Sequence, residues 1–196
     1  SDILEQIFSQ LKTHFTALEQ PLLQNFINAI YRDVSIVDLT TISPPDLSGL
    51  TVSLWREAQE WNGKVAKIKV FNPDVEQDEW QSTHTIISVL SRNIPFIIDT
   101  LKIVLNKQNI NLHRILYSEI HSEREQSGQL KALNKENDTE LLLYIEIDHT
   151  TSPTERLKIK KSLDKALSDV SLVVDDHEEM INKVKDAITA SKKANK

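Results

Sequence analysis

The sequence has 196 residues, of which 39% are hydrophobic and 27% are charged, and its formal net charge at pH 7 is -6. This composition is typical of a soluble globular protein, and the length allows one core with an added helical layer or two small units. The acidic balance disfavours nucleic-acid binding, which needs a basic surface, and no apolar run is long enough to span a membrane. We therefore expect neither a nucleic acid nor a membrane as a partner.

Cysteine is absent, and only three glycines occur, far apart, at Gly49, Gly63 and Gly128. Without cysteine the chain has no disulfides, no thiol nucleophile and no thiolate metal site. Together with a start that lacks a secretory signal, this favours a cytoplasmic protein. Phosphate-binding loops need clustered glycines, so the chain contains neither a dinucleotide fingerprint nor a P-loop. We expect this chain to hold no cofactor and to have no catalytic residues of its own.

Residues 1–63 are predicted to be helical. Apolar residues recur at helical spacing over 3–18 and again over 22–30, where Pro21 restarts the chain. A third helix is expected from Leu47 to Trp61, with Ser43 as its cap and Gly63 as its stop.

Residues 64–196 form a second segment, in which the period first changes from helical to alternating. Ala66, Ile68 and Val70 alternate with lysines, which predicts an edge strand, and a strand that is apolar on both faces follows over 85–91. Pro95 favours the first turn of the next helix, with Asn93 as a reasonable cap.

Two long strands are expected next, at about 110–120 and 140–148, and the polar loop between them over 122–139 implies an antiparallel hairpin. A further helix is expected to begin at Ser152, Pro153 and Glu155, which combine a cap, a proline in the first turn and a capping-box glutamate. The pattern leaves open whether this helix breaks near 175 or continues. Residues 170–174 could be a final strand, but helix is favoured because the segment is short and continues the helical stripe.

The order of these elements predicts an α+β fold. From residue 85 onward it is that of a split βαβ unit of the ferredoxin-like kind without an obvious final strand, preceded by a helical layer. An antiparallel sheet with helices on one face leaves its other face or an edge free for a neighbouring subunit.

Several short blocks, in order along the chain, resemble the amino-terminal region of the large bacterial NAD-specific glutamate dehydrogenases. The resemblance covers about residues 22–185. Its blocks are 54–56, 69–73, Trp80, 84–85, 95–99, 105–107, 112–113, 144–148, 168–170 and 179–180.

The resemblance implies an ACT-type regulatory module that precedes the catalytic region of the same polypeptide, in an enzyme that oxidatively deaminates L-glutamate to 2-oxoglutarate with NAD. Two kinds of partner are implied by the resemblance. One is the catalytic region of the same polypeptide, and the other is further copies of the chain in a homo-oligomer. One alternative is a stand-alone amino-acid-sensing or protein-interaction module. Another is an enzyme in its own right, which the absence of glycine loops disfavours.

Ser91, Arg92, Asn93 and Ile94 are the candidate effector loop. In ACT-like modules amino acids often bind near the turn between the first core strand and its helix, and Arg92 offers a bidentate partner for a carboxylate. The resembling family usually has an acidic pair where this chain has Arg92 and Asn93. The competing interpretation is that the loop only caps the helix.

Other titratable residues give weaker signals. His84, His113, His121 and His149 lack the close spacing of metal ligands. The carboxylates of 123–125 and 136–138 are expected to be solvated loop charges, and Asp99 is expected to stabilise the start of its helix.

Overall fold

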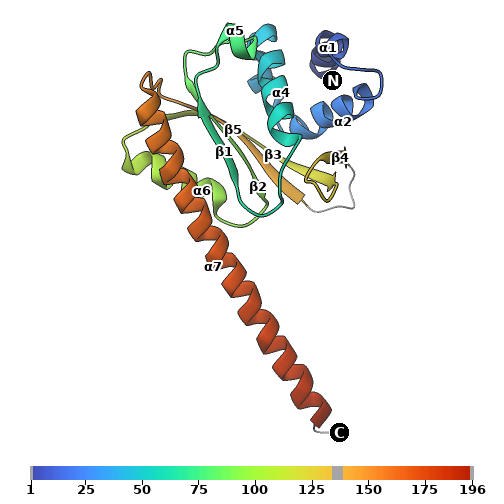
Figure 1. Cartoon of the computed structure of the whole chain (residues 1–196), viewed down its shortest axis with the longest axis vertical. Helices are drawn as coiled ribbons and strands as arrows, with labels where there is room; N and C mark the ends of the chain where they lie inside the picture. The colour runs from blue at the N-terminus through green and yellow to red at the C-terminus, as the bar shows by residue number, and fades with distance from the viewer. Residues whose placement is uncertain (1, 134–138, 195–196) are drawn as a thin grey trace.

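The computed structural model describes residues 2–133 and 139–194 of the chain. A five-stranded sheet lies between two sets of helices, and one long helix runs away from it (Figure 1). The elements that precede the sheet are α1 (Asp2–Leu11), the 3-10 turn η1 (Lys12–His14), α2 (Gln20–Ile30), α3 (Ile36–Thr40) and α4 (Pro44–Ala58).

The ends of α4 follow from local chemistry. Ser43 caps the helix as predicted, because its hydroxyl accepts a hydrogen bond from the backbone N–H of Asp46 at 3.3 Å. The helix ends at Ala58, short of the expected stop at Gly63. The chain leaves the helix early because the N–H of Trp61 donates to the carbonyl of Gly128, which ties this segment to the sheet.

The sheet has the strand order β1-β2-β5-β3-β4, and neighbouring strands are antiparallel. Its strands are β1 (Lys67–Phe71), β2 (Thr85–Arg92), β3 (Leu112–Arg124), β4 (Leu130–Leu133) and β5 (Thr139–Ile147). The predicted edge strand is confirmed, and so is the predicted antiparallel pairing of the two long strands. The prediction of one polar loop over 122–139 is wrong, because β3 continues to Arg124 and β4 forms the second edge.

Helix α6 (Ile97–Lys107) connects β2 to β3, and β5 enters between these two strands, which is the split βαβ arrangement. In a complete ferredoxin-like sheet, a final strand would pair with the other edge of β2. Here β1, which precedes β2 in the sequence, takes that position. Residues 170–174 are helical, as predicted, within the single helix α7 (Pro153–Ala194), so no break occurs near 175. The short helix α5 (Val75–Asp78) lies between β1 and β2.

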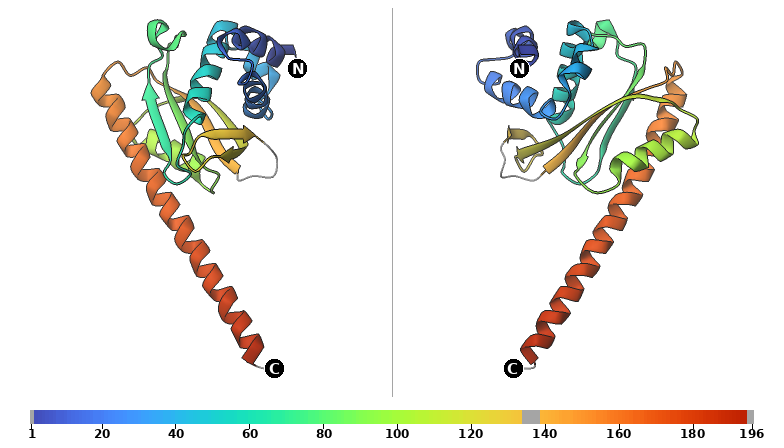
Figure 2. Two further views of the ribbon diagram at one scale, coloured as in Figure 1. Left: turned by 45° about the vertical axis from the view of Figure 1, so that its right-hand side comes forward. Right: turned by 180° about the vertical axis from the view of Figure 1, so that it is seen from behind.

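Both faces of the sheet are covered (Figure 2). Ile87, Val89 and Ile145 pack with α6 and α7, whereas Leu90 and Leu142 pack with the amino-terminal helices. The expectation of a free sheet face is therefore wrong. The reason is that β2 and β5 are apolar on both sides, and two apolar sides need two covering layers.

Candidate effector cleft

The predicted loop begins inside the sheet. Ser91 and Arg92 are the last residues of β2, where Ser91 is buried and Arg92 pairs in register with Glu140 of β5. The N–H of Asn93 donates to Thr139 at 3.3 Å, and that of Ile94 donates to the carbonyl of Arg92 at 3.0 Å. Both backbone donors thus have partners, so the loop does not present the converging N–H groups that were expected.

Asn93 does not cap α6. The cap position is Phe96, which adopts a left-handed backbone with φ of 70° and gives no side-chain cap. Pro95 disfavours helical geometry in the residue before it, which keeps Ile94 outside the helix. Pro95 itself lies before α6 and not in its first turn as predicted, because the helix begins only at Ile97, after the left-handed Phe96. The phenyl ring of Phe96 is left 69% exposed.

Arg92 already binds a carboxylate of its own chain. Its Nη2 lies 2.9 Å from Oδ1 and 3.1 Å from Oδ2 of Asp175 on α7. The two side chains are 35% and 50% exposed, so water screens the pair and its contribution to stability is small. A ligand carboxylate could therefore replace Asp175 on Arg92 at a modest energetic cost.

A cleft of about 970 Å³ lies beside this pair. Its walls are the turn 61–64, the loop 92–94 and the end of the β3–β4 hairpin, residues 122 and 124–128, with 139–140 closing one side. The exposed side chain of Lys64 and the half-exposed side chain of Arg92 line it, and Glu125 supplies an exposed acid. Ser122 also lines the cleft, and its buried hydroxyl has no hydrogen-bond partner in the described structure.

Arg124 also lines the cleft, where it holds three segments together. Its Nε and Nη2 bind the two carboxylate oxygens of Glu140 at 2.7 and 2.8 Å, and its Nη1 donates to the carbonyls of Ala58 and Gly128. The guanidinium also lies 5.8 Å from the ring centre of Trp61. With these donors occupied, Arg124 shapes the cleft rather than serving as a free cation. The sequence did not single out Arg124 as a partner of Glu140, since the two lie on different strands, and the residue that pairs with Glu140 in register is Ile120.

Two of the four candidate histidines meet elsewhere on the sheet. The rings of His84 and His113 lie 4.6 Å apart, with Glu146 at 3.8 Å from the first and Asp148 at 2.7 Å from the second. Hydrogen bonds from the backbone of Asn111 and from His113 hold the pKa of Asp148 below its usual value. His121 and His149 do not join them, and no group of three potential ligands suited to a metal occurs over 2–133 and 139–194.

The predicted loop acids are only partly described. Glu123 forms a surface ion pair with Lys131 at 2.6 Å, which agrees with a solvated charge, and residues 136–138 lie outside the described part of the chain. Asp99 is exposed in the first turn of α6, where a carboxylate stabilises the positive end of the helix dipole.

Comparison with known proteins agrees with this geometry. The split βαβ sheet with its helices is consistent with an ACT-like α+β domain. The family described as "Glutamate dehydrogenase, ACT1 domain" matches residues 26–163, which is more than half of the chain. The chain therefore belongs to this family.

Two curated relatives are similar over nearly the whole chain. The NAD-specific glutamate dehydrogenase of Halomonas elongata is 30% identical over 193 residues, and that of Pseudomonas aeruginosa is 29% identical over 195 residues. The alignments cover 95% and 96% of this chain but only 12% of either relative, so the chain spans about an eighth of their length. No solved structure gives a significant match. In the described residues, no helix has both the length and the apolarity to cross a bilayer.

Proposed function

We propose that this chain is the non-catalytic regulatory and assembly segment of an NAD-dependent glutamate dehydrogenase, and that its cleft binds an amino-acid effector. The parent enzyme would convert L-glutamate, NAD and water to 2-oxoglutarate, ammonium and NADH. NAD would then bind to the catalytic region of that polypeptide, which is also the first partner of this segment. A cytoplasmic location is part of the same proposal.

The cleft beside Arg92 is the observation that carries the effector proposal. Its volume of about 970 Å³ is in the range of small-molecule sites, and it combines cationic side chains with an acid. An amino acid has matching groups, a carboxylate for Arg92 and an ammonium for Glu125. Because its carboxylate would compete with Asp175, binding would release α7 from the end of β2, which gives a physical route from ligand to regulation.

The alternative of a stand-alone sensor uses the same cleft but needs no attached enzyme. The relatives favour the first proposal, because the matched segment is a small part of each of them. Mixing this chain with the remaining catalytic portion and measuring mass by light scattering tests the choice. A stable complex supports a segment of a larger enzyme, and two species that never associate contradict it.

Calorimetry with a panel of amino acids tests effector binding. We expect heat with at least one of them, and we expect Arg92→Ala to abolish it. The matched control is Asp175→Asn, which removes the competing carboxylate and keeps Arg92, so binding should be retained or tightened. If Arg92 only anchors α7, the two variants should behave alike, and no heat with any amino acid would reject the cleft as an effector site.

A further inference from the structure

Helix α7 carries one seam along its length, apolar except for His177, with the alternating spacing of three and four residues that defines a coiled coil. The seam comprises Leu163, Leu167, Val170, Val174, His177, Ile181, Val184 and Ile188. A seven-residue repeat corresponds to 3.5 residues per turn, whereas a straight helix has 3.6. The repeated residues therefore stay on one side over many turns only when the helix coils around a partner.

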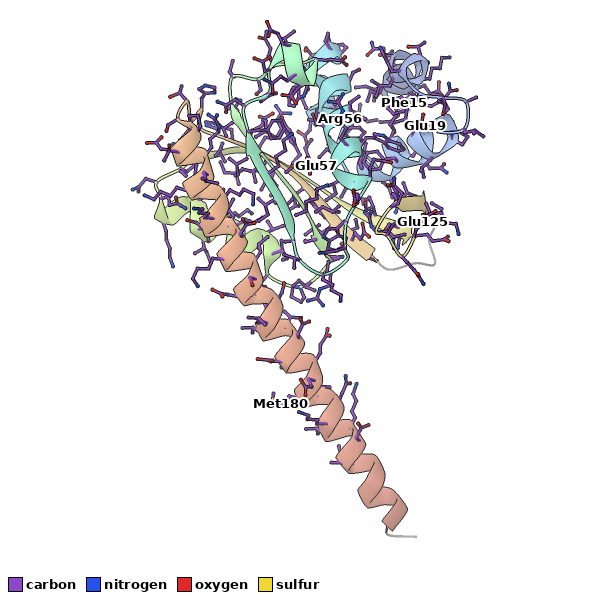
Figure 3. The ribbon with its side chains drawn as sticks, viewed as in Figure 1. Phe15, Glu19, Arg56, Glu57, Glu125 and Met180 are labelled. Carbon is purple, nitrogen blue, oxygen red and sulfur yellow. The ribbon has the colours of Figure 1, made fainter. Side chains whose placement is uncertain are left out.

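Only the first part of this seam has a partner within the domain. Leu163 and Leu167 are 0% and 1% exposed because they pack with the sheet and α6, whereas Ile181, Val184 and Ile188 are 39%, 54% and 50% exposed. Figure 1 shows α7 running on beyond the sheet, and Figure 3 places Met180 on that projecting part. Along the described chain nothing covers this half of the seam, although exposed apolar stripes of this kind mark interaction sites.

The charges around the uncovered seam indicate what covers it. The charged residues just before Met180 are acidic, at Asp175, Asp176, Glu178 and Glu179, whereas after it Lys183 and Lys185 outnumber the single acid Asp186. Two such helices side by side in parallel would bring acid against acid. Side by side in opposite directions, they bring acid against base. A helix with this arrangement therefore complements itself when it is reversed.

We propose that α7 binds α7 of a second copy of this chain as an antiparallel two-helix coiled coil. This deepens the assembly part of the proposed function and is independent of the effector cleft. In the favoured register Ile181 packs opposite the partner's Val184, and Glu178 flanks the partner's Lys185. A shift of one heptad in either direction would instead pair Glu178 with Glu178 or Lys185 with Lys185, so the charges select a single register.

The register also agrees with the shape of the molecule. It is centred between Ile181 and Val184, so position 175, where Arg92 anchors the helix, lies opposite position 190 of the second copy. The two domains then lie at opposite ends of the paired segment. At 1.5 Å per residue the uncovered stretch from 176 to 188 is about 18 Å long.

Sedimentation of the 196-residue chain over a range of concentrations tests the pairing. We expect a reversible dimer, which Ile181→Asp with Val184→Asp converts to a monomer of unchanged circular dichroism. Each single reversal, Glu178→Lys or Lys185→Glu, should weaken the dimer about tenfold, because it creates two like-charge contacts. The double reversal should restore the dimer, and an equal mixture of the two single variants should form mixed dimers.

Cysteine pairing provides a second measurement, because the chain has no native cysteine. Ile181→Cys mixed with Val184→Cys should cross-link readily between chains, whereas Ile181→Cys alone should cross-link poorly. A chain that stays monomeric at all concentrations, or a double charge reversal that fails to restore association, would overturn the proposal. Calorimetry with amino acids on the monomeric variant separates the two ideas, since loss of pairing leaves the cleft intact.

Discussion

The guanidinium of Arg124 and the carboxylate of Glu140 form a two-pronged ion pair in which the side chains are only 10% and 7% exposed. Removing one partner of a buried pair leaves the other charge without compensation, which typically costs about 3–5 kcal/mol. We therefore expect Arg124→Ala to lower the free energy of unfolding in urea by about that amount.

The matched control for this pair is the surface pair of Lys131 and Glu123, whose side chains are 59% and 38% exposed. Lys131→Ala should change the free energy of unfolding by less than about 1 kcal/mol. Equal effects of Arg124→Ala and Lys131→Ala would show that burial does not decide the strength of the Arg124 pair.

Gly49 and Trp80 are in direct contact, since a Cβ at position 49 would overlap Cβ and Cγ of the tryptophan. Alanine normally stabilises a helix relative to glycine by about 1 kcal/mol. Here we expect Gly49→Ala to destabilise the protein by about 1–3 kcal/mol, because the indole ring must move away from α4. Urea unfolding measures the loss, and a double-mutant cycle with Trp80→Gly checks its cause, since the alanine should cost less when both overlapping atoms are absent.

Two buried tyrosines make stability fall at high pH. Burial raises the pKa of Tyr31, which bonds the Thr51 hydroxyl at 2.8 Å, and burial followed by the Glu146 charge raises the pKa of Tyr144. Both phenols stay protonated in the folded state after they ionise in the unfolded chain. Unfolding then releases protons, so their contribution is complete below about pH 10 and is lost as the pH rises, by about 1.4 kcal/mol per pH unit for each.

Urea unfolding between about pH 9 and 11 measures this dependence. Tyr31→Phe should remove one of the two contributions and flatten the slope. A slope unaffected by Tyr31→Phe would contradict the role of its burial.

The ion pair of Arg92 and Asp175 should contribute little to global stability. Because the side chains are 35% and 50% exposed, we expect Asp175→Ala to change the free energy of unfolding by less than about 1 kcal/mol. Thermal unfolding measures this difference. A larger loss would mean that Arg92→Ala also harms the fold, and the calorimetric test would then need the conservative variant Arg92→Lys.

The parts of the fold that the sequence predicts are those with a clear local period. The lysines that alternate with Ile68 predicted the edge strand, and the pairing of the two long strands followed from their alternation and spacing. Strand β4 was missed because its four residues show too little alternation within a polar stretch. The start of α6 was misplaced because Phe96 adopts a left-handed backbone, which the sequence does not indicate for a phenylalanine.

The site was predicted less completely than the fold. The sequence indicated the loop at Arg92, which lies on the cleft, but the partner Asp175 is 83 residues away and only the path of α7 brings it close. The covering of both sheet faces was not predicted, although the strand over 85–91 is apolar on both sides and therefore needs a covering layer on each. Amphipathic periodicity shows that a helix packs but not against which face.

The single helix α7 has a mechanical consequence. An α-helix is stiff over this length, and the 13 residue steps from Asp175 to Ile188 span about 20 Å at 1.5 Å per step. A tilt of about 10° where the helix leaves the sheet would move Ile188 sideways by about 3 Å, which is more than half the height of one helical turn. A small displacement of the helix at Asp175, where Arg92 binds it, would thus produce a larger displacement at Ile188.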